Sequence, residues 1–303
     1  MPDDTLLSPA QTAARLPYPA MATEIAALLA DPAVQVPPRL VQPLPGGGSL
    51  FVMPAHDARV AITKLISYTP ANAGTGRPAI QGDVVVFDIA TGERRLVLDG
   101  PTVTARRTAA VSLLAAQTLA LNLQGPLLIV GAGVQGRSHL EAFATGLGLR
   151  DVKIASRRAA SAQALAEHAR GLGLRAEVIT DPDAALTDCP LVVTSTPASG
   201  VVLRAAPRPD AFIAAVGAFT PRMVELAPEL CRHIAERGTV VVDTRDADHE
   251  AGDLLQAGLD VTRFATLQDV LRAKKNRSQG PVLFKSCGWA GWDLAAARLA
   301  LLD

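Results

Sequence analysis

Cysteine and histidine are scarce in this chain, and neither is spaced as a metal site or a disulfide framework requires. The 303 residues include five histidines and three cysteines, Cys189, Cys231 and Cys287. The cysteines are odd in number and widely separated, so zinc-type spacing is absent and a set of disulfides is excluded. We therefore expect no metal site, and a reducing compartment such as the cytoplasm.

An excess of charge of either sign is also missing. Lys plus Arg and Asp plus Glu number 29 each, which leaves a formal net charge of zero. This balance argues against nucleic acid and against an anionic membrane as the main partner. It also removes charge repulsion as a barrier to self-association. A secretion signal is not expected, because Glu24 interrupts the first apolar stretch.

One long segment, residues 108–136, has no charge at all. A membrane-spanning helix needs about 20 mainly apolar residues. Here Ser112, Asn122 and the pair Gly125-Pro126 interrupt the apolar pattern. The segment therefore predicts a buried helix, a turn and a buried strand.

The rhythm of the sequence changes near residue 120, and the length suits two domains. In the first part, proline- and glycine-rich turns separate β-like runs at 50–53, 60–66 and 84–89, preceded by a helix at 21–30. In the second part, short apolar runs alternate with alanine-rich helical segments, as in a parallel sheet with helices on both faces. These runs lie at 127–131, 152–155, 176–179, 191–194, 211–217 and 239–243.

The predicted fold is α/β: a Rossmann-type doubly wound parallel sheet plus an α+β domain. We place the Rossmann domain at 119–289 and the other domain at 1–118. A final helix at 290–303 is expected to return and complete the first domain.

Residues 131–136 match the pattern G-x-G-x-x-G between a β-run and a helix. In a dinucleotide site Gly131 makes the tight turn, Gly133 admits the pyrophosphate, and Gly136 lets the helix pack on the strand. Val134 and Gln135 would then lie beside the phosphates at the helix N-terminus. The alternative is a glycine-rich turn that binds nothing.

The residues at the end of the second strand of the parallel sheet are expected to determine whether the cofactor is NADH or NADPH. Asp151 opens that strand and lies at its wrong end for a ribose, whereas the far end reads Ser156-Arg157-Arg158. A hydroxyl and two guanidiniums suit a 2′-phosphate, so NADPH is preferred and NADH is not excluded. The alternative is a pair of solvated arginines.

Polar residues follow the fourth run of the parallel sheet, at the carboxyl edge where ligands of such folds bind. We expect Thr194, Ser195, Thr196 and Pro197 to line the ribose and nicotinamide part of the site. Thr and Ser also cap loops, which is the simpler account.

Three cations in the first domain stand in apolar surroundings: Arg39 after "VPP", Lys64 in "VAITKLIS" and Arg107 in "TVTARRTAAV". A buried charge needs a partner. No acidic residue adjoins any of them, which favours a bound anion; a distant Asp or Glu is the alternative.

The chain resembles the ornithine cyclodeaminase/μ-crystallin family over almost its whole length. The stretches that carry the resemblance are "VPPR" (36–39), "FVMPA" (51–55), "ITKLIS" (62–67), "FDIATGERRLVLDG" (87–100), "TARRTAAVSLLAAQTLA" (104–120), "GAGVQGRSHLEA" (131–142), "VGAFTPRMVEL" (216–226) and "GWDLAAA" (291–297).

The resemblance implies a substrate-binding and dimerising domain followed by a Rossmann domain, and so a homodimer. It implies that Arg39, Lys64 and Arg107 hold a substrate carboxylate. Lys64 and Arg107 are the expected catalytic residues, with Lys64 as candidate proton donor. Thr108 and Val216, in two of the matching stretches, are expected to contact the cofactor.

Phe219 stands where cyclodeaminases of the family have an Asp that engages the ornithine amine. A phenyl ring neither accepts a hydrogen bond from an ammonium nor acts as a base. The resemblance therefore implies reduction of a cyclic imino acid, Δ1-pyrroline-2-carboxylate to L-proline and Δ1-piperideine-2-carboxylate to L-pipecolate. Cyclodeaminase or amino-acid dehydrogenase activity, and a non-catalytic NADPH-binding role, are the alternatives.

Two further residues have simple interpretations. Asp293 opens the final helix, where N-capping explains it, but it matches a family position near the active site and is kept as a substrate-binding candidate. His139, on the helix after the glycine loop, is expected to pack or cap rather than to catalyse.

Overall fold

The computed structural model describes residues 5–72, 75–273 and 280–302. The chain folds into two compact units, 1–107 with 289–303 and 108–288. The division falls within helix α3 (Gly100–Leu119), whereas the sequence placed a boundary at 118/119, the end of the same helix.

The first unit contains an antiparallel sheet of five strands in sequential order β1 to β5. Turns join neighbouring strands, most of them with proline or glycine, which makes sequential pairing the short connection. The strands are β1 (Leu40–Leu44), β2 (Gly48–His56), β3 (Val60–Tyr68), β4 (Ile80–Asp88) and β5 (Arg94–Asp99), and the helices are α1 (Pro9–Ala14), α2 (Tyr18–Ala30) and α11 (Ala290–Ala300).

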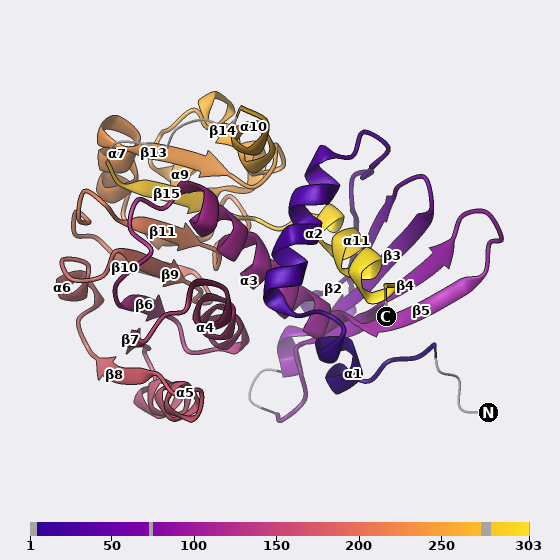
Figure 1. The fold of residues 1–303 in the computed structure, drawn as a ribbon, viewed down its shortest axis with the longest axis horizontal. Coiled ribbons are helices and arrows are strands. Elements are labelled where there is room, and N and C mark those ends of the chain that lie inside the picture. Colours follow the sequence, from indigo (N-terminus) through magenta and orange to yellow (C-terminus); the bar gives the residue numbers. More distant parts are fainter. Residues whose placement is uncertain (1–4, 73–74, 274–279, 303) are drawn as a thin grey trace. The chain divides into compact units, whose positions relative to one another are not determined.

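The C-terminal helix α11 lies against α2 and against β2 and β3 (Figure 1). Alternation along β3 sends Ile62, Lys64 and Ile66 to the buried face and leaves Leu65 exposed. Lys64 therefore points toward the face that α11 covers.

The second unit is built on an eight-stranded, all-parallel sheet in the order β14-β13-β15-β11-β9-β6-β7-β8. Its strands are β6 (Leu127–Val130), β7 (Asp151–Ala155), β8 (Arg175–Ile179), β9 (Leu191–Thr194), β11 (Phe212–Ala215), β13 (Thr239–Val242), β14 (Ala265–Thr266) and β15 (Val282–Lys285). A small parallel pair joins β10 (Ser199–Leu203) to β12 (Val224–Leu226). The chain moves outward from β6 to β8 and then crosses back to β9, so the order reverses between β6 and β9.

Helices cover both faces of this sheet, as the alternation of short apolar strands and helical segments predicts. Leu128 and Val130 of β6 belong to a core cluster with α7 and α9, while Ile129 faces α4. The helices are α4 (Val134–Leu147), α5 (Ala159–Gly171), α6 (Pro182–Ala185), α7 (Pro228–Arg237), α8 (Ala247–Glu250), α9 (Gly252–Gln256) and α10 (Leu267–Ala273).

The observed topology confirms the predicted fold class, a Rossmann-type sheet with an α+β unit. All six apolar runs of the second part form strands of the parallel sheet. The sequence analysis did not identify β15, which lies between β11 and β13 and ends in the buried Lys285.

Candidate active site

The glycine loop lies between β6 and α4, at the point where the strand order reverses. Gly131 has a φ of +114°, and a Cβ there would lie 2.6 Å from the Ser195 carbonyl oxygen. A Cβ on Gly136 would lie 2.0 Å from the Gly131 oxygen, so the helix can approach the strand only without one. Gly133, by contrast, faces open space. Close packing thus requires glycine at positions 131 and 136, whereas a Cβ at position 133 would contact none of the described residues.

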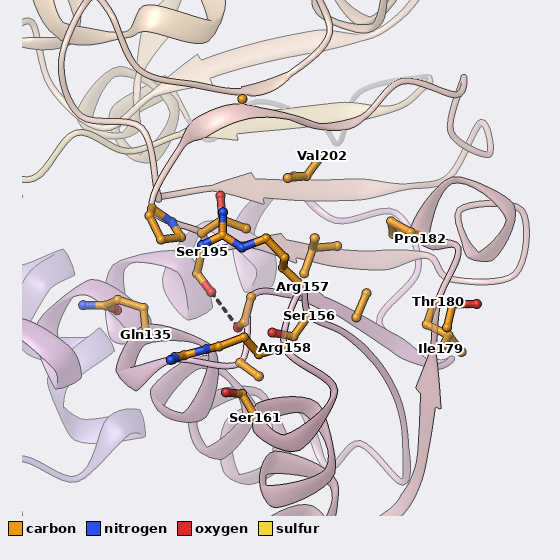
Figure 2. Close-up of a pocket in the computed structure, with 18 of the residues that line it drawn as sticks. Gln135, Ser156, Arg157, Arg158, Ser161, Ile179, Thr180, Pro182, Ser195 and Val202 are labelled. Carbon is orange, nitrogen blue, oxygen red and sulfur yellow. Dashed lines mark hydrogen bonds between the residues drawn. The ribbon is translucent and has the colours of Figure 1, made fainter. Parts of the chain in front are cut away.

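A cavity of about 670 Å³ opens beside this loop (Figure 2). Its wall includes Ser195, whose hydroxyl donates to the Gly131 oxygen at 3.2 Å. A hollow of this size holds a cofactor-sized ligand. The described residues that line it are Val130 to Gln135, Ala155 to Arg158, Ser161, Ile179, Thr180, Pro182, Ser195 to Pro197, Gly200 and Val202.

Positive charge is concentrated where β7 ends. Arg157 and Arg158 are exposed beside Ser156, and Arg158 precedes the first turn of α5 (Figure 2). Among the described lining residues none is acidic. Asp151 lies at the opposite end of β7, where Arg175 donates to it at 2.6 Å. The structure thus separates Asp151 from the cavity, as the sequence analysis expected.

Four residues expected at the cofactor do not line this cavity, and the first is Gly136, which packs against Gly131 instead. Thr194 is fully buried, and its hydroxyl donates to Glu225 at 2.9 Å. Val216 and Thr108 are also buried, on the segment after β11 and on α3. For Thr194 the physical reason is plain: its polar group already has a partner beneath the strand ends.

In the first unit, β3, α3 and α11 bring together a lysine, an arginine and an aspartate. Lys64 Nζ lies 3.1 Å and Arg107 Nε 3.3 Å from Oδ1 of Asp293. Lys64 also donates to the Thr104 hydroxyl at 2.5 Å. All three charged side chains are buried, while Asp293 Oδ2 has no hydrogen-bond partner in the structure.

Asp293 corrects two expectations. It is not an N-cap, because α11 begins after Trp289 and Asp293 lies inside the first turn. It is also the distant acidic partner that the sequence allowed as an alternative to a bound anion. Lys64 and Arg107 therefore do not both need an anion as counter-ion. One carboxylate cancels only one of the two cations, however, and the cluster retains a net positive charge.

Burial lowers the pKa of Lys64 to about 8. The positive charge of Arg107 also lowers this pKa, whereas the carboxylate of Asp293 raises it. A lysine with such a pKa releases and binds protons near neutrality. Lys64 can therefore both attract an anion and exchange a proton.

Arg39 and Phe219 lie on other segments of the chain. Arg39 is half-buried directly before β1. Phe219, in the second unit, is 48% exposed between β11 and β12. An exposed phenyl ring is available to a ligand but offers no acceptor for an amine.

His139 is fully buried in α4. Its Nδ1 lies 2.8 Å from the Gln135 oxygen and its Nε2 2.9 Å from the Ser112 hydroxyl. Because a carbonyl only accepts, Nδ1 donates. In the neutral ring, which burial favours, Nε2 then accepts from the Ser112 hydroxyl. Burial lowers the His139 pKa to about 4. The residue packs and links two helices, as expected.

A buried charged group under the carboxyl ends of β9 and β11 was not predicted from the sequence. Glu225, Asp253 and Lys285 are each at most 1% exposed. The signal was available: each is a single charge in an apolar run, "MVEL", "GDLL" and "VLFK". A lone charge in a buried run requires a partner, but the sequence does not say which.

Within the described ranges, no group of three or more His, Cys, Asp or Glu residues is arranged to hold a metal ion. The same residues also include no helix long and apolar enough to cross a bilayer.

A glycine loop and a cavity at the switch point of a doubly wound sheet define a dinucleotide-binding protein of the Rossmann class. The model of the Ornithine cyclodeaminase/mu-crystallin family matches residues 18–301. The chain belongs to this family, which confirms the resemblance noted from its motifs.

Two relatives and one solved structure illustrate the similarity. Delta(1)-pyrroline-2-carboxylate reductase 2 of Burkholderia ambifaria is 41% identical over 294 residues, 96% of this chain and 93% of that protein. The Delta(1)-pyrroline-2-carboxylate/Delta(1)-piperideine-2-carboxylate reductase of Azospirillum brasilense is 41% identical over 305 residues, 98% and 96% of the two chains. Thermococcus litoralis Delta(1)-pyrroline-2-carboxylate reductase, solved with NADH and L-proline, superimposes with a TM-score of 0.88 at 23% identity, covering 98% and 96%. At that identity the solved structure shows the common fold.

Proposed function

We propose that the chain is an NAD(P)H-dependent reductase of cyclic ketimine carboxylates, converting Δ1-pyrroline-2-carboxylate to L-proline and Δ1-piperideine-2-carboxylate to L-pipecolate. The observation that carries the proposal is the buried Lys64–Asp293–Arg107 cluster with its net positive charge, in a chain 41% identical to reductases of these compounds.

The first unit binds the substrate in this proposal. Arg107 and Lys64, with Arg39, hold the carboxylate, since charge-assisted hydrogen bonds to carboxylates are the strong ones. Asp293 keeps the two buried cations in place and leaves one positive charge for the substrate. Holding the acid group fixes the orientation of the ring. Because binding has then already removed the translational and rotational freedom of the reactants, alignment can lower the reaction barrier by about 7–11 kcal/mol.

The second unit holds the cofactor. The residues fit the group: Gly133 leaves open space, the N–H groups at the start of α4 are not capped by a side chain, and the cavity is large enough. Gly131, Val134, Gln135, Ser195, Thr196 and Pro197 would border it, and Gly136 supports the loop from behind. Bound NAD(P)H supplies the hydride that the imine carbon accepts.

Lys64 delivers the proton that the imine nitrogen takes up. With a pKa of about 8 it is mostly protonated near neutral pH yet gives up the proton readily. After the reaction the Lys64 amine is reprotonated by water.

NADPH is the preferred cofactor. Arg157 and Arg158, with Ser156, offer donors to a 2′-phosphate, and no described lining residue offers a carboxylate to a 2′-hydroxyl. NADH remains a usable cofactor, because the glycine loop serves both.

The chain forms a homodimer through the outer face of the five-stranded sheet. Leu40, Val52 and Leu65 lie in register on neighbouring strands of that face, and Leu40 is 59% and Leu65 44% exposed. Such an apolar row is typical of an interface. The first unit is then the substrate-binding and dimerisation domain. Because all three cysteines are free thiols, we place the dimer in the reducing cytoplasm.

The proposed activity is tested by following NADPH oxidation with freshly prepared pyrroline- and piperideine-2-carboxylate. L-Ornithine is expected to release no ammonia, because Phe219 offers its amine no acceptor. L-Alanine is expected not to reduce NADP⁺. Binding of NADPH without turnover of either imino acid would instead favour a non-catalytic role.

Arg107→Ala is the sharpest variant for the substrate site. Truncating one partner of a buried charge pair costs about 2–5 kcal/mol, so KM for the imino acid should rise at least tenfold while the NADPH Kd stays within twofold. Arg106→Ala is the matched control: Arg106 donates to the Leu16 oxygen at 2.7 Å and stacks on Tyr18, away from Asp293. An equal loss of NADPH affinity in Arg107→Ala would contradict the assignment.

A further inference from the structure

Glu225, in the middle of β12, is a fully buried carboxylate that accepts four hydrogen bonds. Oε1 accepts from the backbone N–H and the hydroxyl of Thr196 at 2.6 and 2.8 Å. Oε2 accepts from the N–H of Gly217 at 2.7 Å and the hydroxyl of Thr194 at 2.9 Å. Both oxygens are therefore fully used as acceptors.

Thr194 is the last residue of β9, and the other donors belong to two different loops. Thr196 follows β9 and lines the cofactor cavity, and Gly217 follows β11. The approach is close: a Cβ on Gly217 would lie 2.4 Å from both Glu225 Oε1 and the Thr196 oxygen. One carboxylate thus joins two neighbouring strand ends at the carboxyl edge of the sheet.

The loop that Glu225 holds is not a relaxed one. Ala198 has a φ of 53°, a conformation that residues with a Cβ rarely adopt. Its N–H donates to the Thr196 hydroxyl at 3.1 Å, and its oxygen accepts from Val224 N–H at 3.2 Å. Such a conformation persists only where surrounding bonds enforce it, and here they come from Thr196 and β12.

A buried ion pair lies beneath the loop and contacts the backbone of β12. Asp253 Oδ1 accepts from the N–H groups of Glu225 and Leu226 at 2.6 and 2.9 Å, and Lys285 Nζ lies 2.8 Å from Asp253 Oδ2. Burial raises the pKa of Glu225, while Lys285 and the Thr196 N–H oppose it. Each of its two oxygens faces a backbone N–H, so an acceptor is needed at both positions.

We infer that Glu225 is a positioning residue of the cofactor site, which holds the Ser195–Pro197 wall of the cavity in its binding shape. The inference rests on the proposed function, since it takes the cavity to be the NADPH site. Glutamine cannot replace Glu225, because its amide NH₂ would face either the Thr196 or the Gly217 N–H, and two donors do not bond.

The test measures NADPH binding to the full-length protein directly, by fluorescence titration, together with steady-state kinetics and thermal unfolding. Glu225→Gln is expected to weaken the NADPH Kd and raise the KM for NADPH at least tenfold, with the KM for the imino acid within twofold. Glu229→Gln is the matched control. That residue is exposed on α7, where it pairs with Arg232, so its Kd should match the wild type.

A Kd unchanged in Glu225→Gln, even with a lower Tm, would overturn the inference and leave Glu225 a purely structural residue. Should that variant not fold, Gly217→Ala tests the same contact by wedging a methyl group between Glu225 and Thr196, and it should also weaken NADPH binding. If the wild type itself binds no NADPH, the proposed function fails, which is a separate outcome.

Discussion

Lys64 is buried, and burial disfavours the protonated, charged form of its amine. Asp293 is what counters the burial, because its carboxylate favours the protonated amine from 3.1 Å away. The lysine pKa of about 8 therefore depends on a residue of the last helix. Substrate binding and proton supply both depend on this one titration.

The kcat/KM for the imino acid should be high below pH 8 and fall as the pH rises through about 8, because Lys64 then loses the charge that binds the carboxylate. A lost charged hydrogen bond of about 1.5 kcal/mol or more corresponds to about tenfold. In Asp293→Asn the Lys64 pKa is lowered further, so the fall should begin at lower pH.

The measurement is a pH profile of kcat/KM for the wild type and both Asp293→Asn and Asp188→Asn. Asp188 is an exposed acid of the other unit, paired with Lys153, and its variant should keep the wild-type profile. Titration of the substrate affects all three proteins alike, so identical profiles in all three would exclude Lys64 as the titrating group.

Helix α4 depends on a histidine that must stay neutral. His139 connects the Gln135 carbonyl, next to the glycine loop, with Ser112 of α3. Since the folded protein lowers the His139 pKa from 6.5 to about 4, the unfolded chain binds the proton more readily in that interval. Lowering the pH therefore destabilises the contact that His139 makes between α4 and α3, beside the glycine loop.

The free energy of unfolding should decrease as the pH falls from 6.5 to 4, with about 3 kcal/mol of the decrease due to His139 and no further loss from it below pH 4. His139→Gln keeps a donor and an acceptor but does not titrate, so its acid-induced loss should be smaller by about that amount. Urea unfolding across this range measures the difference. His249→Gln, at an exposed position, should behave like the wild type; an equal slope in His139→Gln would refute the assignment.

The proposed preference for NADPH rests on the end of β7, where Arg157 and Arg158 lie. Replacing both Arg157 and Arg158 with Ala should weaken NADPH binding at least tenfold, since a hydrogen bond to a charged group contributes about 1.5–3 kcal/mol, and should change NADH binding less than twofold. Titration of both cofactors measures this. Arg150→Ala, an exposed arginine just before β7, is the control. Equal weakening of NADH would mean that the arginines shape the site rather than recognise the phosphate.

For the molecule as a whole, the outer sheet face of the first unit is the proposed dimer interface. Leu65→Glu would place a charge in the middle of the row formed with Leu40 and Val52. We expect it to shift the dimer to monomer in light scattering at micromolar concentration. Leu172→Glu, at a leucine 48% exposed in the second unit, should leave the mass unchanged. A monomeric wild type, or a dimeric Leu65→Glu, would contradict the proposed interface.

Local patterns carried a large part of the fold. The glycine loop, the six apolar runs and three of the five turn-separated strands (β2, β3 and β4) were identified from the sequence, because strand and turn preferences act over a few residues. The strand β15 was not predicted; its sequence "VLFK" has only three apolar residues before a lysine. Only the packed structure supplies the Asp253 that makes Lys285 acceptable there.

The sequence by itself determined the class of fold, the place of the cofactor loop and the three cations expected at the substrate. Tertiary structure alone decided their partners: Asp293 lies 229 positions from Lys64 along the chain, and Glu225 meets Thr194, Thr196 and Gly217 only once β9, β11 and β12 are assembled. The physical reason is the difference in range. Backbone preferences are local and can be read in order, whereas a buried charge is stabilised by whichever opposite charge or donor the folded chain brings within about 3 Å.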